Sequence, residues 1–382
     1  MKIGIDATFS PHGGSLVHLQ KFVEGFTETV PKLEVVLYIK KENVSLIKKD
    51  ILEKCVIKVI KIASYGIFSR VLWTQLVFPI TLKFDQISVL FSPGNFSPII
   101  KTTKVKSQWI ATIGPFCKDM YENNKISTRF SLFINKWIII FSSFTSNVVI
   151  HQAEYSRQLF VKKYYLRPSN QYLIQFGKDD YFKPDLKKID ENNKISNISS
   201  NDLLYVSHIF PYKNIQMLIE VFIKFKNRNN TNSKLYIVGK IMDRRHYNLL
   251  LRIIDDHNFN DKIIFTGLSS KKDLKYAYSV CKLFTFPSLC ESSGYSLIEA
   301  MSCGAPILAS NKTAIPFTCG DAAEYFNPYN DDEFLSKLEK LYFDNNKLQS
   351  LMNKSLDRAN EILNYKVATK NYLEIIRPFF LN

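Results

Sequence analysis

Two glutamates flank a turn of small residues in the stretch PSLCESSGYSLIEAMSCGAPILAS, which covers residues 287–310. Glu291 comes before the turn and Glu299 after it. Carboxylates accept hydrogen bonds from hydroxyl groups, and the free N–H groups at the start of a helix bind anions. The stretch could therefore hold a ligand that carries both hydroxyl groups and negative charge.

The elements around this motif place it where a strand ends and a helix begins. The apolar run 283–288 predicts the strand, and residues 295–303 predict the helix, with Ser293 as a candidate N-cap. Glu291 then follows the carboxyl end of the strand, and Glu299 lies on the first or second turn of the helix. This arrangement suits a nucleotide sugar, with backbone N–H groups for the diphosphate and one carboxylate each for ribose and sugar. The alternative is a pair of surface carboxylates near a helix cap.

Strand and helix patterns alternate in two series, which predicts two doubly wound parallel-sheet domains with a cleft between them. The polar stretch 183–202 separates the series and is predicted to be a linker. We expect an N-terminal domain over 1–182 and a C-terminal domain over 203–365. Residues 366–382 are predicted to form a final helix that packs back toward the N-terminal domain. In the first series we expect strands at 2–6, 33–39, 88–93 and 108–113 and a helix at about 14–29.

Composition limits the class of protein. The 382 residues are 46% apolar, which predicts a globular protein of about two domains. The net charge is +16, and residues 1–180 hold 24 Lys and Arg against 13 Asp and Glu, a surplus of 11 that leaves 5 for the rest. An anionic partner is therefore expected for the first half: an anionic membrane surface, a phosphorylated substrate or nucleic acid. Nucleic acid ranks last, because zinc-finger spacing, an RNP-like strand and an Arg-rich arm are all missing.

The cysteines, the N-terminus and two apolar stretches bear on location. Six cysteines without C-x-x-C spacing argue against a metal cage and a secreted disulfide scaffold, and favour a reducing compartment. The start MKIGIDATF lacks the apolar core of a signal peptide, so we expect a cytoplasmic protein.

Residues 130–150 are interrupted by Asn135 and Lys136, which favours a buried helix followed by a strand over a membrane span. The stretch 68–84 fits either a bilayer-surface helix or an ordinary half-buried one.

The Glu291 motif with its AMSCGAP continuation resembles the signature of retaining GT-B glycosyltransferases, glycosyltransferase family 4 or group 1 type. YVSHIFPYKN, IVGK, IIFTGLSSKKDLKYAYSVCKLFTFPS and GDAAEYFNPYNDDEF also resemble that family. In the first half, HGGSLVHLQKF, NVVIHQAEYSRQLF and LIQFGKDDYF are weaker matches. The resemblance covers nearly the whole chain, is dense after residue 200 and is thin between 40 and 105. It implies the GT-B fold, two Rossmann-like domains that face each other across a cleft.

The resemblance also assigns roles to residues of the donor site. It implies that Glu291 contacts the donor sugar, that Glu299 binds the ribose, and that Lys213 neutralises the diphosphate as it leaves. The backbone expected to hold the sugar and phosphate end is that of Gly294, Tyr295, Ser296 and Leu297. No metal and no cofactor other than the nucleotide sugar is expected, because the aspartate pairs 179–180 and 331–332 lack a D-x-D arrangement and neighbouring histidines.

The chain departs from the family pattern at two places. His208 stands where many relatives carry Arg, and it could still donate a hydrogen bond to phosphate, although a purely structural role fits equally well. Ile113 and Gly114 stand where many relatives have His-Asp, the histidine facing the sugar. We expect the small Gly114 to leave room for the acceptor.

The glycine loop after the first strand is the remaining candidate site. Gly13 and Gly14 would let backbone approach the phosphates, although a plain tight turn explains the pair as well. His12 is a candidate for acceptor contact.

Together these features predict a hexosyltransferase that uses a UDP- or GDP-sugar, retains the anomeric configuration and acts in bacterial surface polysaccharide synthesis. The expected acceptor is a glycan carried on a polyprenyl diphosphate, reached by a cytoplasmic protein bound peripherally to the inner membrane. Two alternatives remain: a GT-B nucleotide-sugar epimerase, and a non-catalytic family member that serves as a partner or scaffold. The sequence leaves the oligomeric state open.

Overall fold

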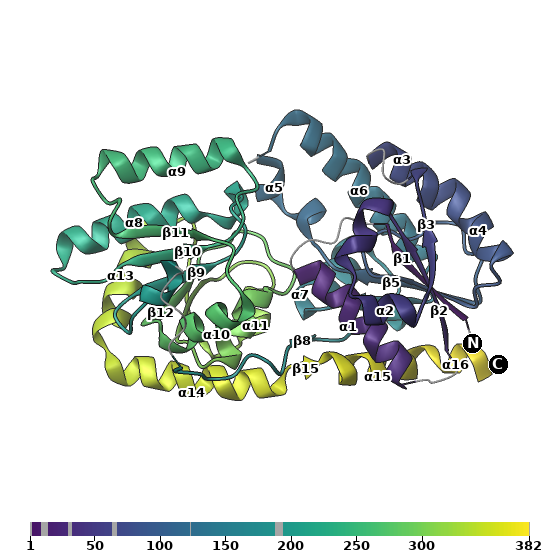
Figure 1. Ribbon diagram of the computed structural model, residues 1–382. Coiled ribbons are helices and arrows are strands. Elements are labelled where there is room, and N and C mark those ends of the chain that lie inside the picture. The colour runs from purple at the N-terminus through teal and green to yellow at the C-terminus, as the bar shows by residue number, and fades with distance from the viewer. Residues whose placement is uncertain are drawn as a thin grey trace. The chain divides into compact units, whose positions relative to one another are not determined.

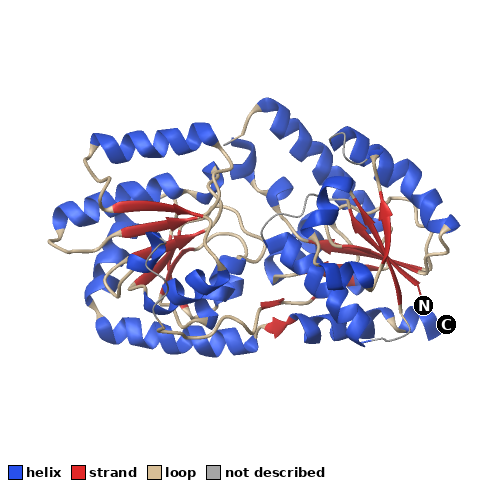
Figure 2. Cartoon of the chain, viewed as in Figure 1, coloured by secondary structure: helices blue, strands red, loops and turns tan. Residues whose placement is uncertain are grey.

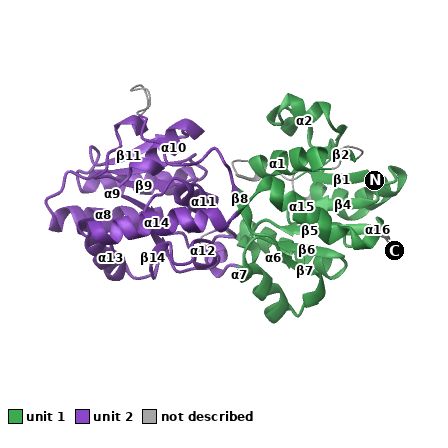
Figure 3. Cartoon of the chain, turned by 90° about the horizontal axis from the view of Figure 1, so that it is seen from below, with its two compact units in different colours: residues 1–116, 125–177, 363–382 green, residues 117–124, 178–362 purple. Residues whose placement is uncertain are grey.

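The computed structural model describes residues 2–8, 14–29, 33–62, 67–122, 124–187 and 194–381. The chain divides into two compact units, coloured separately in Figure 3. Unit 1 consists of Met1–Phe116, Lys125–Gly177 and Leu363–Asn382, and unit 2 consists of Cys117–Asn124 and Lys178–Ile362. His12 and Gly13 lie outside the described residues.

Unit 1 is built on a parallel sheet. Its described strands follow the order β3-β2-β1-β4-β5-β6-β7. Each neighbouring pair is parallel, so all carboxyl ends meet at one edge. The strands are β1 (Lys2–Ala7), β2 (Glu34–Ile39), β3 (Val56–Val59), β4 (Val89–Ser92), β5 (Val105–Ile110), β6 (Val148–His151) and β7 (Gln171–Leu173).

Helices cover both faces of this sheet, because side chains along a buried strand point alternately to the two sides. On β5, Trp109 packs with α1 (Gly14–Thr29) and α15 (Tyr365–Ile376), whereas Gln108 contacts α6 (Ile126–Phe144) on the other face. Figure 2 shows these helices in blue around the red strands. The remaining helices of unit 1 are α2 (Lys49–Glu53), α3 (Ile67–Leu72), α4 (Phe78–Phe84), α7 (Glu154–Gln158) and α16 (Pro378–Leu381), with the π-helical turns η3 (Trp73–Val77) and η5 (Leu159–Lys163) and the 3₁₀ turns η1 (Lys41–Leu46), η4 (Gly114–Phe116) and η6 (Pro168–Asn170).

Unit 2 repeats this design with the strand order β11-β10-β9-β12-β13-β14 among its described residues. The strands are β9 (Leu203–Val206), β10 (Leu235–Val238), β11 (Ile263–Gly267), β12 (Leu283–Phe286), β13 (Ile307–Ser310) and β14 (Ala323–Phe326). The helices are α5 (Lys118–Glu122), α8 (Ile215–Arg228), α9 (Arg244–Asp256), α10 (Lys271–Val280), α11 (Tyr295–Ser302), α12 (Ile315–Cys319), α13 (Asp331–Phe343) and α14 (Asn345–Glu361), with the 3₁₀ turns η7 (Lys194–Asn197) and η8 (Pro211–Lys213). Both sheets are of the doubly wound type predicted from the sequence.

The chain passes between the units at places that differ from the predicted boundaries. The division falls after Gly177 and again after Ile362, rather than at 182 and 365. The described part of the predicted linker 183–202 belongs to unit 2, where Ile195 and Ile198 are buried in the hydrophobic core. A short pair of strands, β8 (Phe176–Lys178) and β15 (Leu363–Asn364), joins the two crossing points.

The C-terminal segment completes unit 1. Helix α15 packs along α1 (Figure 1), and the side-chain oxygens of Tyr372 and Ser107 on β5 lie 2.6 Å apart in a hydrogen bond. Tyr365 and Tyr372 lie in the main core of the unit.

The apolar stretch at 130–150 is not the buried helix that the sequence predicts. It forms most of α6 and then β6, but α6 is buried on one side only, since Phe130 is 58% and Phe133 is 51% exposed. In the described part of the chain, no helix is both long and apolar enough to cross a membrane.

Candidate functional site

An ion pair forms the centre of the site in unit 2. The ammonium nitrogen of Lys213 lies 2.5 Å from a carboxylate oxygen of Glu291, and each side chain is 11% exposed. Lys213 ends the turn after β9, and Glu291 follows β12. Because β9 and β12 are parallel neighbours, their carboxyl ends place these two segments side by side. The sheet therefore brings together two residues that are far apart in the sequence.

Aromatic rings and loop contacts surround the ammonium group of Lys213. The ring centres of Tyr212 and Phe286 lie 5.2 and 5.9 Å from it, at the distance of cation–π contacts. The backbone N–H of Leu289 donates to Tyr212 O, which joins the loops after β9 and β12. Burial lowers the pKa of Lys213, but the charge of Glu291, the nearby Tyr212 and the hydrogen bond to Glu291 together raise the pKa above the usual value. The group is therefore a fixed positive charge at neutral pH.

The backbone of Glu291 is held by the loop after β13. Its N–H donates to Thr313 Oγ1 at 2.9 Å, and its carbonyl accepts from the N–H of Ala314. Glu291, which follows β12, is thus held at its side chain by the loop after β9 and at its backbone by the loop after β13.

The N-cap of helix α11 is Gly294 rather than the predicted Ser293. Gly294 has a φ of 73°, and a Cβ atom there would lie 2.8 Å from Leu297 Cδ1. Ser293 is buried, its hydroxyl has no partner among the described residues, and its carbonyl accepts from Thr318. The prediction failed because the turn into the helix passes through the left-handed region, which places a glycine at the N-cap.

The start of α11 presents backbone N–H groups at this edge of the sheet. Leu297 N and Ile298 N both donate to Gly294 O, so the N–H group of Ser296 precedes the hydrogen bonds of the helix. Such groups, with the helix dipole behind them, favour an anion. Glu291 lies three residues before Gly294 in the sequence, and Lys213 is paired with it. A positive charge and a carboxylate therefore both lie near the start of α11.

Glu299 lies further along α11 and is half-buried. The hydroxyl of Tyr278 on α10 donates to its Oε2 atom at 3.1 Å. Burial raises the pKa of Glu299 to about 7, although the hydrogen bond from Tyr278 acts in the opposite direction. The carboxyl group therefore changes charge near neutral pH, and its oxygens can accept hydrogen bonds.

His208 follows β9 on the same edge of the sheet. The backbone N–H of Lys240 donates to its Nδ1 atom at 3.4 Å. A neutral ring in this state carries its proton on Nε2, which makes that atom a donor.

The remaining predicted site residues belong to unit 1. Gly14 opens α1, and Gly114 is buried at the start of η4. Ile113 is 1% exposed, so a buried apolar side chain stands at the position of the histidine in the family pattern. Their relation to the ion pair of unit 2 stays a prediction.

A disulfide bond joins Cys117 to Cys290, directly before Glu291. The Cα atoms are 6.4 Å apart, and 173 positions separate the two residues in the sequence. The expectation from cysteine spacing missed this pair, because a single long-range disulfide leaves no spacing pattern. In the same segment, the hydroxyl of Tyr329 donates to Asp119. Residues 117–122 are thereby attached to the loops that carry the site.

Metal ligands do not gather at this site. Within the described ranges, no group of three or more His, Cys, Asp and Glu side chains is close enough to hold a metal ion.

The chain is similar to known glycosyltransferases, over part of its sequence and over nearly all of its fold. Residues 187–358 match the family of glycosyl transferases group 1. The chain is similar to the serotype-specific mannosyltransferase WbdA of Escherichia coli, with 32% identity over 143 residues, which is 37% of this chain and 17% of that protein. The matched part thus spans less than a fifth of that relative.

Two solved structures have the same fold over nearly the whole chain. WaaG, a glycosyltransferase involved in lipopolysaccharide biosynthesis, is 15% identical with a TM-score of 0.74, covering 98% of this chain and 99% of WaaG. Anabaena HepE in complex with UDP-glucose is 13% identical with a TM-score of 0.74, covering 99% of this chain and all of HepE. The chain therefore has the GT-B fold, and its residues 187–358 match the glycosyl transferases group 1 family.

Proposed function

We propose that the protein transfers a hexosyl group from a UDP- or GDP-sugar to a glycan acceptor, with retention of the anomeric configuration and without a metal ion. The observation that carries this proposal is the Lys213–Glu291 pair at the start of α11. It offers a positive charge, backbone N–H donors and a carboxylate to one ligand. A nucleoside diphosphate sugar has the complementary groups, namely a diphosphate and a set of hydroxyl groups.

In the proposed reaction, the diphosphate binds at the first turn of α11 and Lys213 moves from Glu291 toward it. Glu291 is then free to accept a hydrogen bond from a sugar hydroxyl, and Glu299 accepts from the ribose. The bond between the anomeric carbon and the diphosphate breaks, and a bond to the acceptor oxygen forms. The acceptor proton leaves with the diphosphate. Lys213 and the helix stabilise the charge that develops on the leaving group. His208 could add one hydrogen bond.

The acceptor side of the proposal rests on the basic first half of the chain and on the relatives. A mannosyltransferase of a bacterial serotype and a lipopolysaccharide glycosyltransferase are both similar to this chain. We propose that the acceptor is a glycan on a polyprenyl diphosphate at the cytoplasmic face of the inner membrane, in bacterial surface polysaccharide synthesis. Gly14, Gly114, His12 and Gly13 of the first half are the candidate contacts for acceptor and phosphates.

The first test is thermal stabilisation by UDP, GDP, ADP and CMP, each with and without divalent metal. A nucleotide at about a hundred times its dissociation constant should add about 2.7 kcal/mol to the free energy of unfolding. We expect one diphosphate to act without metal and to lose its effect in Lys213→Ala. Lys224→Ala is the matched control, since Lys224 pairs with Asp331 on the exposed side of unit 2.

Turnover then separates the transferase from its alternatives. A panel of UDP- and GDP-hexoses, including GDP-mannose, is offered with a lipid-linked disaccharide, and the product linkage is read by NMR. Sugar isomerised without any acceptor would identify an epimerase. Nucleotide binding without turnover of any donor, together with unchanged cell-surface glycan in Glu291→Ala, would identify a non-catalytic partner. The buried Ile113 is the observation that keeps this last outcome in the test.

A further inference from the structure

Helix α6 of unit 1 carries an exposed row of large apolar side chains. They recur every three or four residues, so they share one side of the helix. Their exposed fractions run from 41% to 82%, in a position where a surface helix is normally polar. The row consists of Ile126, Phe130, Phe133, Trp137, Phe141 and Phe144.

The rings of this row pack against one another rather than into the unit. The ring centres of Phe133 and Trp137 are 6.3 Å apart, and those of Trp137 and Phe141 are 5.8 Å apart in a stacked arrangement. The opposite side of α6 is buried against the sheet, with Ile139 only 1% exposed. The row is thus a formed surface that the rest of unit 1 leaves uncovered.

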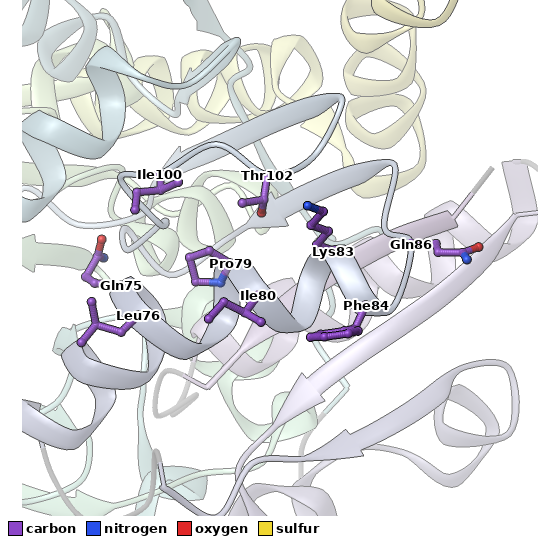
Figure 4. A pocket seen from close by; sticks show the side chains of 9 residues that line it. All are labelled: Gln75, Leu76, Pro79, Ile80, Lys83, Phe84, Gln86, Ile100 and Thr102. Carbon is purple, nitrogen blue, oxygen red and sulfur yellow. The ribbon is translucent and has the colours of Figure 1, made fainter.

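A second apolar surface lies on η3 and α4. Leu76, Ile80 and Phe84 are 58%, 59% and 83% exposed, and they line a groove of about 710 Å³. Figure 4 shows Ile80 and Phe84 on the helix, with Ile100 and Thr102 on the neighbouring loop. The groove is therefore an open and largely apolar trough.

Hydrogen bonds join these two surfaces into one face of unit 1. The Gln75 side chain donates to Ser97 O and accepts from the N–H of Ile99, which attaches this loop to η3. The ammonium group of Lys106 donates to Pro98 O and to the hydroxyl of Thr145, which follows α6. Figure 1 shows α3, α4 and α6 on the same side of the sheet. We call the exposed apolar residues of η3, α4, α6 and Ile100 the docking face.

The charged side chains within the segments of the docking face are basic, and the carboxylate that directly follows them, that of Asp85, is paired with Lys58. Residues 67–84, 97–104 and 125–145 contain seven Lys and Arg and no Asp or Glu. Lys83, Lys101 and Lys125 are exposed. In a symmetric dimer the same patch would face itself, so these cations would meet cations. An anionic surface is the complementary partner.

We propose that the docking face binds an anionic lipid bilayer, with the aromatic row of α6 inserted at the level of the headgroups and the lysines on the lipid phosphates. Aromatic side chains favour that level of a bilayer, and each Lys or Arg near an anionic surface adds to binding. This inference rests on the proposed function, which places the acceptor in a membrane. The two are tested separately, because vesicle binding is measured without nucleotide or acceptor.

Trp137 is a built-in reporter for the experiment. Of the three tryptophans in the chain, Trp73 and Trp109 are 5% and 1% exposed, whereas Trp137 is 41% exposed. The full chain is mixed with vesicles of phosphatidylethanolamine and phosphatidylglycerol, or of phosphatidylcholine alone. We expect cosedimentation with the anionic vesicles, a blue shift of Trp emission, and quenching by lipids brominated in the acyl chain.

Two pairs of variants locate the binding surface. Phe130→Ser with Phe141→Ser keeps the reporter and should weaken vesicle binding on the order of a hundredfold, because two large side chains no longer insert. Its matched control is Leu268→Ser with Phe343→Ser, which changes two exposed apolar residues of unit 2.

The second pair isolates charge. Lys101→Gln with Lys125→Gln should weaken binding on the order of tenfold, whereas Lys234→Gln with Lys272→Gln in unit 2 removes the same charge and should have little effect. All four variants change exposed residues, and circular dichroism checks that each folds like the wild type.

Three results would overturn the proposal. The first is absence of vesicle binding by the wild type. The second is equal loss of binding in the test and control variants, which would show that vesicle binding depends on net charge or on nonspecific hydrophobic adsorption rather than on this face. The third is a blue shift of Trp137 that depends on protein concentration and needs no lipid, because it would show that a second copy of the chain covers the face. Nucleotide stabilisation can persist in all three cases, so the proposed function would stand.

Discussion

At the residue scale, the Lys213–Glu291 pair contributes to the stability of the fold and, in the proposed reaction, to catalysis, and the two contributions are measured separately. Each charge is nearly buried, so removing one leaves the other without a partner, at a cost of about 3–5 kcal/mol in the free energy of unfolding. We predict that Lys213→Ala loses stability in this range and, in the proposed reaction, lowers kcat/KM on the order of a hundredfold or more. Urea unfolding and initial rates check both. A Lys213→Ala enzyme with wild-type kcat/KM would exclude Lys213 from stabilising the leaving group.

Glu299 gives a pH dependence of known sign. Its pKa of about 7 in the folded protein lies above the usual 4.5, so the folded state holds the proton more tightly than the unfolded chain. Its contribution to stability is present below pH 4.5 and is lost as the pH rises to 7, by about 3 kcal/mol in total. We predict that the stability of Glu299→Gln relative to wild type increases by about this amount from pH 4.5 to pH 8. Urea unfolding of both proteins across this range measures it, and a constant difference would contradict the assignment.

At the scale of elements, the turn at Gly294 sets where α11 begins. Alanine there would adopt a left-handed φ, at about 1–2 kcal/mol, and would also meet Leu297. Gly267 is a matched control, since its φ is 76° and a Cβ there would meet nothing within 4 Å. We predict that Gly294→Ala destabilises the protein more than Gly267→Ala does, as measured by urea unfolding. Equal losses would mean that Leu297 yields without cost.

The elements also show what the sequence could predict. Helix α1 was predicted over about 14–29, as found, because its apolar period is regular. Strand β3 was missed, since none of its residues is buried and it offers no apolar run. Strand β5 was predicted at 108–113 instead of Val105–Ile110, because its buried Lys106 and Ser107 look like loop residues until their partners Thr145 and Tyr372 are known.

The candidate site also contains some features that could be predicted from the sequence and others that could not. The motif around Glu291 and Glu299 could be located from local patterns, and so could the turn that carries Lys213. The contact between Lys213 and Glu291 could not, since it depends on the order of the strands. Tyr278 and Cys117 approach the site from other elements, and nothing in their neighbouring residues marks them.

At the scale of the whole molecule, the disulfide bond between Cys117 and Cys290 predicts how many cysteines react as free thiols. Four thiols are free in the structure, those of Cys55, Cys281, Cys303 and Cys319. Alkylation in denaturant without reductant should therefore label four cysteines, and all six should be labelled after reduction. Reduction should also lower the free energy of unfolding by about 2–4 kcal/mol, because the closed loop is long. Six labelled cysteines without reductant would show that Cys117 and Cys290 are thiols in solution.

The contribution of α15 to unit 1 has a consequence for the order of synthesis. The main part of unit 2, residues 178–362, is continuous in the chain, whereas unit 1 needs Tyr365 and Tyr372 for its main core. Domains tend to fold as units while the chain emerges from the ribosome. The unit that contains Lys213 and Glu291 can thus complete its core during translation. The core of unit 1 beside α1 stays incomplete until the residues of α15 have been made.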